Sequence, residues 1–285
     1  MRSLTKTLIG LALLLAIVLV GSILLWKVLV SRAPNAVVIP PAEQCAATVE
    51  GVQYSLTLEQ SGNAAIIVGE TLRRGLPARA ATIALVTALQ ESSLRNLDHG
   101  DADSVGLFQQ RPSQGWGTAS EIMDPWYATG KFLDAMVKIS GWQTMDVNDV
   151  AQQVQRSGVP DGYRKHESTA KAWASALSGN SPASVSCVDR GSGAGTVSPI
   201  ATLLTKVFGS HLTVKSSAST VTLASSNSST LWAASQLAMM TTGDSGITRV
   251  TVGQQRWAMD ANSVADWSGS AAPSPTSASI SVRTS

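Results

Sequence analysis

An apolar run near the N-terminus constrains where the rest of this chain can fold. From Leu8 to Trp26 the sequence LIGLALLLAIVLVGSILLW holds 19 residues without a charge. As a helix this run is about 28 Å long, close to the ~30 Å thickness of the hydrocarbon core of a membrane. We therefore predict a cytoplasmic tip and a transmembrane signal anchor within residues 1–32, with residues 8–30 embedded in the membrane.

The alternative to an anchor is a signal peptide that is removed by cleavage. The apolar part of a signal peptide usually has about 7–15 residues and is followed by an A-x-A-like cleavage site. The sequence VSRAPNA after this run offers no such site, which favours an uncleaved anchor. Arg2 and Lys6 precede the run, and Lys27 and Arg32 follow it, so the charge bias toward a cytoplasmic N-terminus is weak.

Cysteine and histidine usage indicates the compartment and excludes one kind of site. Cys45 and Cys187 are the only cysteines, and they flank a long central block. This arrangement is typical of one disulfide formed in an oxidising compartment, with two unpaired buried thiols as the alternative. Two cysteines and three histidines are too few for a Cys/His zinc site, so we expect no metal and no cofactor.

The charge distribution bears on the partners. The net charge is +2, and the four bases before residue 33 face no acid there, so the remainder has slightly fewer bases than acids. A chain of this balance that is 44% hydrophobic is neither a disordered acidic protein nor a polybasic nucleic-acid binder. We therefore expect no nucleic acid as a partner.

Turn and capping residues divide the rest of the chain. Residues 33–44, with Pro34, Pro40 and Pro41, predict a stiff linker, and residues 45–187 predict a mainly helical domain. Helix signals such as Asp124-Pro125 recur through this domain. Helices are expected over residues 60–74, 77–92, 124–136, from 146 onward, and 164–177. Residues 93–121 are rich in Gly, Asp, Ser and Pro and predict a loop or short strands.

The hydrophobic period changes after the second cysteine. Residues 188–197 are rich in Gly and Ser and predict a flexible linker. Alternating segments at 211–217, 219–225 and 247–260 predict strands around a helix over 230–240, so residues 198–267 form a small α+β domain. The Ser/Ala/Pro-rich tail at 268–285 is expected to be disordered.

The stretch ALQESSLRNLDHGDADSVGLFQQRPSQGWG, at residues 88–117, is the one most typical of a catalytic site. Glu91 falls near the end of a predicted helix, on the same face as Ala84, Thr87 and Ala88. A carboxyl held against such a small, mostly apolar surface loses hydration, so its pKa should rise toward the value that suits a general acid. Glu91 is therefore the candidate proton donor.

The motif Glu91-Ser92, followed by Ser104-x-Gly-Leu-Phe-Gln109-x-x-Pro112, resembles the lysozyme-like family of goose-type lysozymes and lytic transglycosylases. In that family a helix ends in Glu-Ser, and a loop leads to a Gly-Leu-Met-Gln segment. The resemblance covers roughly residues 60–178. The family's Ala-Tyr-Asn-Ala-Gly motif is absent; the nearest segment is VQRSGVPDGY at 154–163, which leaves substrate contacts of Gln155, Ser157 or Tyr163 open.

The resemblance implies an enzyme that cleaves the β-1,4 bonds of peptidoglycan glycan strands. Together with the apolar run and the two cysteines, it predicts a single-pass protein of the bacterial cell membrane with its C-terminal bulk outside the cytoplasm. Glu91 would protonate the glycosidic oxygen as an oxocarbenium-like sugar develops. In lytic transglycosylases the same carboxylate then takes the proton of the muramyl 6-hydroxyl, which closes a 1,6-anhydro ring. Tyr163 would orient Glu91, because a late tyrosine does so in many family members.

Further residues near the motif are candidates for contact with substrate or water. We expect substrate contacts from Ser104, Gln109, Gln110, Trp116 and Tyr163. A goose-type hydrolase would need an acid to position water, and Asp101 or Asp103 lies in about the right place for one. Turn-forming aspartates are the alternative interpretation of both residues.

A second class of function fits the same residues. In this alternative a degenerate lysozyme-like domain binds glycan without cleaving it, and the C-terminal domain recruits an envelope protein. The absent third motif favours this scaffold, whereas Glu91 and the 106–109 segment favour the enzyme. The expected architecture is the same for both: a mainly α lysozyme-like domain, a small α+β domain and one transmembrane helix.

Overall fold

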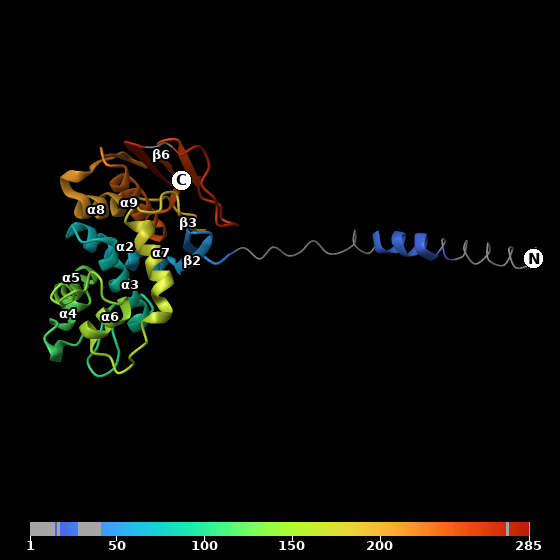
Figure 1. Ribbon diagram of the computed structural model, residues 1–285. Helices are drawn as coiled ribbons and strands as arrows, with labels where there is room; N and C mark the ends of the chain where they lie inside the picture. Colours follow the sequence, from blue (N-terminus) through green and yellow to red (C-terminus); the bar gives the residue numbers. More distant parts are fainter. Residues whose placement is uncertain (1–14, 16–17, 28–40, 272–273, 285) are drawn as a thin grey trace, which may run out of the picture. The chain divides into compact units, whose positions relative to one another are not determined.

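The computed structural model describes residue 15 and residues 18–27, 41–271 and 274–284, in two units that span 1–40 and 41–285 (Figure 1). In the first unit, the described residues at 15 and 18–27 are helical and their side chains are exposed. Residues 8–14, 16–17 and 28–30 of the predicted membrane segment, and residues 33–40 of the predicted linker, lie outside the described residues. Within the described ranges, no helix combines the length and the apolar character needed to cross a membrane.

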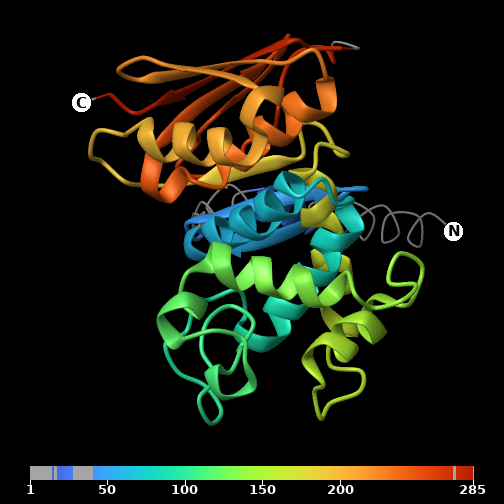
Figure 2. The ribbon, with the colours of Figure 1, turned by 90° about the vertical axis from the view of Figure 1, so that its left-hand side faces the viewer.

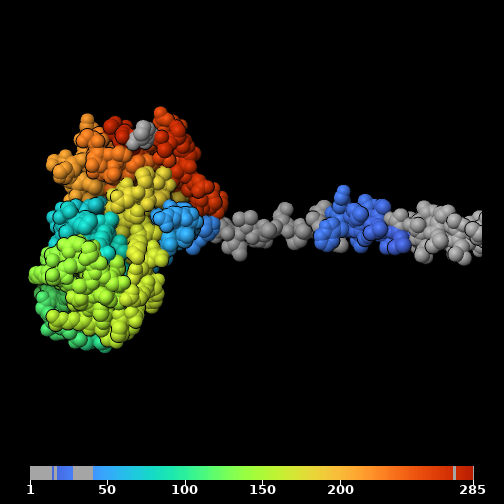
Figure 3. Space-filling model, viewed as in Figure 1, coloured from blue at the N-terminus to red at the C-terminus, as the bar shows by residue number. Residues whose placement is uncertain are grey.

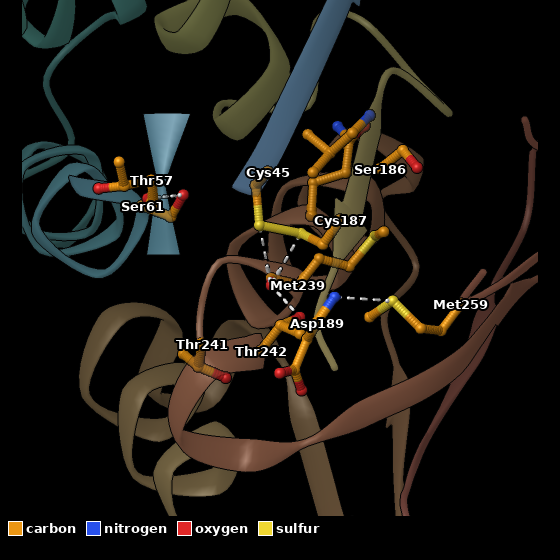
Figure 4. The surroundings of a disulfide bond; sticks show 12 residues. Cys45, Thr57, Ser61, Ser186, Cys187, Asp189, Met239, Thr241, Thr242 and Met259 are labelled. Atoms are coloured by element: carbon orange, nitrogen blue, oxygen red, sulfur yellow. Dashed lines mark hydrogen bonds between the residues drawn. A yellow bond between two sulfur atoms is a disulfide. The ribbon is translucent and has the colours of Figure 1, made fainter. Parts of the chain in front are cut away.

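The second unit is mixed α/β and begins with a small antiparallel sheet. Its strands are β1 (Gln44–Val49), β2 (Val52–Thr57) and β3 (Val185–Val188), in the order β2-β1-β3. Cys45 lies directly opposite Cys187 in the register of β1 and β3, and the two form a disulfide. Both cysteines are fully buried, and the carbonyl oxygen of Met239 lies 3.4 Å from Cys187 Sγ (Figure 4). The predicted disulfide is confirmed.

Helices fill the chain between the two cysteines. They are α2 (Leu58–Arg73), α3 (Ala78–Ser92), η1 (Pro112–Gln114), α4 (Ala119–Ile122), α5 (Pro125–Met136), α6 (Val147–Gln155), η2 (Arg164–His166) and α7 (Glu167–Leu177). Local signals set several of the boundaries. Thr57 and Gln60 form a reciprocal capping box at α2, and the Asp124 side chain accepts a hydrogen bond from the Trp126 amide at α5. The predicted helices are therefore found, with boundaries shifted by a few residues.

The C-terminal part is a five-stranded antiparallel sheet with helices on one face (Figure 2). Its elements are α8 (Ser198–Phe208), η3 (Gly209–His211), β4 (Thr213–Ser216), β5 (Thr220–Ala224), α9 (Ser228–Met239), α10 (Thr242–Ser245), β6 (Ile247–Val252), β7 (Gln255–Ala258) and β8 (Ser277–Val282). The strand order is β4-β5-β8-β6-β7. The predicted strand pairs β4–β5 and β6–β7 and the helix α9 are all present.

Residues 277–282 of the tail form the central strand of this sheet, so the prediction of a disordered tail at 268–285 is wrong for this stretch. β8 pairs with both β5 and β6, and Ala278, Ile280 and Val282 are buried while the serines between them face outward. Small apolar residues that alternate with serine have the period of a half-buried strand. The Ser/Ala/Pro composition of the tail suggested disorder, but the alternation of apolar residues and serines is what fits this segment to a strand.

The predicted separation into two domains also differs from the structure, in which residues 41–285 form one compact unit. One hydrophobic core runs through both parts, because α7 and α2 pack against α9 and α8. The expected flexible linker at 188–197 is held in place: Arg283 pairs with Asp189 at 2.7 Å, and the Gly195 amide donates to the Arg283 carbonyl. A Cβ at Gly195 would lie 2.4 Å from the Ser245 carbonyl oxygen, so this glycine allows the close approach.

Candidate active site

Glu91 lies in the last turn of α3, at the border between the core and solvent. Its side chain is half-buried, and the helix ends at Ser92, followed by the capping residue Ser93 with a positive φ of 53°. Ala84, Thr87 and Ala88, which were predicted to share its face, are fully buried. The carboxyl group is therefore carried by a rigid, well-packed helix at the point where the chain turns into the motif loop.

Ser92 joins the end of this helix to the Gly-Leu-Phe-Gln segment. Its hydroxyl is placed to donate to the Leu107 carbonyl at 2.7 Å, and it also lies 3.0 Å from the Ala88 carbonyl. Gly106 has a φ of +79°, and a Cβ there would lie 2.9 Å from the Ile122 carbonyl oxygen. Ser92 and Gly106 of the motif therefore both serve to hold the loop in place beside Glu91.

Tyr163 brings a distant segment to Glu91. Its hydroxyl donates a hydrogen bond to Glu91 Oε1 at 2.7 Å, and its side chain is fully buried. Burial, followed by the hydrogen bond to Glu91, raises the pKa of Tyr163 well above its usual value. The hydroxyl therefore remains a protonated donor to the carboxylate.

The segment at 154–163, the nearest in sequence to the family's absent third motif, is hydrogen-bonded to the loop at Phe108 and to helix α6. Gln155 Nε2 donates to the Phe108 carbonyl at 2.7 Å, and the Tyr163 amide donates to Asn148 Oδ1 at 3.3 Å. His166 Nε2 lies 3.2 Å from Gln90 Oε1, next to Glu91 in sequence. Asn148 and His166 carry no signal in the sequence, because a single polar residue on a helix does not identify its partner.

The other predicted substrate contacts differ in their accessibility. Ser104 and Gln110 are buried, and Gln110 Nε2 donates to the Ala128 carbonyl at 3.1 Å, so both belong to the support of the loop. Gln109 is only partly buried, and its Nε2 lies 3.2 Å from the Gly106 carbonyl and 3.3 Å from the His99 carbonyl. Of these three, Gln109 is the side chain best placed to reach a ligand.

The two candidate second carboxylates have different environments. Asp103 accepts hydrogen bonds from the Ser113 amide, from Ser113 Oγ and from Arg111 Nε, at 2.8 to 2.9 Å. The Ser113 amide, then Arg111, lowers the pKa of Asp103 to about 2. Asp101 is exposed, and no hydrogen bond to its carboxylate is found among the described residues. Asp103 therefore holds the loop, as a turn-forming aspartate does.

Two hollows of the second unit are lined by residues other than Glu91. One of about 950 Å³ lies between α2 and α8, and another of about 550 Å³ is formed by Trp116 and α5. Trp126 borders the first, with Lys206 Nζ 3.9 Å from the centre of its ring. Glu91 lines neither hollow, so Trp116 is not brought to Glu91 by a shared cavity. Among the described residues, no group of three or more His, Cys, Asp or Glu is arranged to hold a metal ion.

Comparison with protein-family models gives no match for this chain, and comparison with curated proteins gives none either.

Proposed function

We propose that this protein is a membrane-anchored, extracytoplasmic enzyme that cleaves the β-1,4 glycosidic bonds of peptidoglycan glycan strands. The observation that carries the proposal is the contact between Glu91 and Tyr163, beside a loop that Ser92 joins to the same helix. It is the arrangement that the motif resemblance predicts from residues far apart in the sequence. The Cys45–Cys187 disulfide supports an oxidising compartment, and the apolar run at 8–26 supports the anchor.

Glu91 performs the proton transfers in this mechanism. Protonated Glu91 donates its proton to the glycosidic oxygen, the bond from that oxygen to the sugar C1 breaks, and the sugar acquires oxocarbenium character. The Glu91 carboxylate then accepts the proton of the muramyl 6-hydroxyl while the hydroxyl oxygen attacks C1. Tyr163 fixes the carboxylate through both steps by its hydrogen bond to Oε1.

The hydrogen bonds that Asp103 accepts within its own loop favour the anhydro-forming reaction over hydrolysis. A hydrolase would need a free carboxylate to position water, and Asp103 is bound by Ser113 and Arg111. The anhydro route needs only Glu91. We therefore expect products with 1,6-anhydro-muramyl ends, and Asp101 is the residue whose loss would matter if reducing ends appeared instead.

The test is digestion of purified peptidoglycan by the full chain, with the products identified by mass spectrometry. Glu91→Gln preserves the shape of the side chain and removes its transferable proton, so the rate should fall by about a hundredfold or more. Glu59→Gln is the matched control, because Glu59 is exposed in the first turn of α2. Full activity of the Glu91 variant would overturn the proposal.

A glycan-binding scaffold is the second candidate. It is favoured by the absence from the sequence of the family's Ala-Tyr-Asn-Ala-Gly motif. In that case the wild-type protein binds glycan strands and releases no product, and Glu91→Gln leaves binding unchanged. The same preparation and the same substrate therefore separate the two functions.

A further inference from the structure

The five-stranded sheet of the C-terminal part has one covered face and one open face. Val221, Ile280, Val250 and Trp257 are fully buried neighbours across four strands of the covered face. This face packs on α9, and Trp257 Nε1 donates to Ser186 Oγ on β3. Figure 2 shows the sheet above its helices, with the opposite face directed away from them. Among the described residues, no helix or strand covers that opposite face.

One row of side chains crosses the open face from edge to edge. The strand register aligns Lys215 of β4 with Thr222 of β5, Thr222 with Ser279 of β8, Ser279 with Thr251 of β6, and Thr251 with Arg256 of β7. Adjacent strands are about 4.8 Å apart, so the row is about 19 Å long. It carries a cation at each end and three hydroxyls between them.

The neighbouring rows continue this chemistry. The next one aligns Thr220, Ser281, Arg249 and Ala258, and on the other side Thr213, Ala224 and Ser277 are aligned. We call these residues, together with the first row, the hydroxyl face. A hollow of about 410 Å³ lies on it, and its polar lining consists of Thr213, Lys215, Thr222, Thr251, Ser277 and Ser279.

The charges of the hydroxyl face have a single sign. Strands β4 to β8 contain no acidic residue, and Lys215, Arg249 and Arg256 are exposed. None of the three has an ion-pair partner among the described residues. Two acids lie near the β7 edge of the face. Asp260 follows the end of β7, and its carboxylate accepts hydrogen bonds from the Asn262 amide and Ser263 Oγ. Asp266 is exposed two residues before Ser268, which pairs with Arg256. The three cations outnumber these two acids. The face is therefore complementary to an anion.

We propose that the hydroxyl face binds an anionic, hydroxyl-rich polymer of the polyol phosphate class. Arg and Lys bind phosphate by charge-assisted hydrogen bonds, and Ser and Thr hydroxyls can both donate to and accept from polyol hydroxyls. A row of about 19 Å suits an extended chain better than a single small anion. This function lies beyond the cleavage assigned to Glu91 and does not depend on it.

The composition of the face argues against two other anionic partners. Single-stranded nucleic acids bind on aromatic side chains that stack with the bases, and the hydroxyl face has no aromatic residue. Protein interfaces are enriched in aromatic residues and depleted in serine, which is the opposite of this surface. These partners are therefore alternatives for the test to exclude.

The first experiment measures binding of poly(glycerol phosphate) to the full chain by calorimetry at low and high salt. The wild-type protein should bind, and its affinity should fall as salt rises, because exposed charges are screened. The triple variant Lys215→Gln, Arg249→Gln, Arg256→Gln should bind about tenfold more weakly or worse, because it loses three charge-assisted contacts. The matched control is Arg95→Gln, Lys165→Gln, Lys171→Gln, which removes three exposed cations elsewhere and should bind as the wild type does.

The second experiment tests the hydroxyls. Thr222→Val, Thr251→Val and Ser279→Ala together should weaken binding of poly(glycerol phosphate). Polyglutamate and single-stranded DNA share its charge, and both should bind the wild type more weakly than poly(glycerol phosphate) does. Protection of Lys215 from acetylation by bound polymer, read by mass spectrometry, locates the site on the wild-type chain and does not depend on any variant folding.

Three results would overturn the proposal. They are absence of binding by the wild type, equal loss of affinity in the two charge triples, and equally tight binding of DNA or polyglutamate. Failure of the peptidoglycan digestion would leave these readouts unaffected, since none of the substituted positions of the hydroxyl face belongs to the Glu91 site.

Discussion

At the scale of single residues, the hydrogen bond from Tyr163 to Glu91 is the contact most open to test. Tyr163→Phe removes only the hydroxyl, so kcat on peptidoglycan should fall about ten- to a hundredfold, the equivalent of one hydrogen bond to a charged group. KM should stay unchanged, because the Tyr163 side chain is fully buried and therefore does not contact the substrate. The free energy of unfolding should change by about 1 kcal/mol or less, since water can reach the half-buried Glu91 in the variant.

Tyr54→Phe, a change on strand β2, is the control for loss of a tyrosine hydroxyl elsewhere. Steady-state kinetics together with denaturant unfolding gives both quantities for each variant. An unchanged kcat in Tyr163→Phe would mean that the tyrosine ring only fills the space beside Glu91 and that its hydroxyl has no part in positioning the Glu91 carboxyl group.

Asp103 gives a pH-dependent prediction. Its folded-state pKa of about 2 lies below the ordinary 3.8, so the stability it contributes is fully present above pH 3.8 and is lost as the pH falls toward 2. Asp103→Asn should therefore lower the melting temperature by a few degrees at neutral pH. The difference between wild type and variant should shrink through this acidic range, as measured by thermal unfolding at a series of pH values.

Asp101→Asn is the matched control, because the Asp101 side chain is exposed. It should leave the melting temperature unchanged at every pH. Both variants should keep substantial activity if the products carry anhydro ends. A pH-independent loss of stability in Asp103→Asn would show that the charge of the carboxylate is not what holds the loop.

At the scale of elements, the loop beside Glu91 depends on Gly106. Gly106→Ala places a methyl group 2.9 Å from the Ile122 carbonyl oxygen at a φ of +79°. The free energy of unfolding should fall by about 2–3 kcal/mol. Gly115 has the same φ with no atom within 4 Å of its Cβ position, so Gly115→Ala isolates the backbone term of about 1 kcal/mol. Equal losses in the two variants, measured by denaturant unfolding, would contradict the importance of the close approach.

The elements that the sequence predicted are those with signals inside their own span. The Asp124-Pro125 start of α5 and the alternation in β4 and β5 are local, and both are found. β1 and β2 were missed because β1 completes its sheet with β3, more than a hundred residues away. The candidate site follows the same rule. The local motif predicted Glu91 and the family resemblance predicted Tyr163. The hydrogen bond from Gln155 to the Phe108 carbonyl joins residues far apart in the sequence, so only the folded structure reveals it.

At the scale of the whole molecule, the tail closes the fold that the sequence divided into separate parts. Residues 277–282 looked like a disordered extension, yet they form the strand between β5 and β6. Arg283 then anchors the 189–195 segment through Asp189 and the Gly193 carbonyl. A glycine-rich sequence shows only that a segment can be flexible. Whether the 189–195 segment is fixed depends on Arg283, which lies far along the chain.

Gln236 is the residue on which the union of the two parts can be tested. It is fully buried in α9, where Oε1 accepts from the Ser184 and Val185 amides and Nε2 donates to the Ala176 carbonyl. Gln236→Leu leaves these backbone groups buried without partners, so the free energy of unfolding should fall by about 3 kcal/mol or more. Gln254→Leu, at an exposed glutamine, should stay within about 0.5 kcal/mol of the wild type.

The same contacts predict the behaviour of a fragment that ends at Asp189. Such a fragment loses α9, so the Ser184 and Val185 amides lose Gln236 and the disulfide loses the cover of Met239. We expect residues 41–189 alone to aggregate or to lack a cooperative unfolding transition, which calorimetry and light scattering measure. A fragment that melts cooperatively at the temperature of residues 41–285, together with a neutral Gln236→Leu, would show that the helical part is an independent domain and that α9 only rests against it.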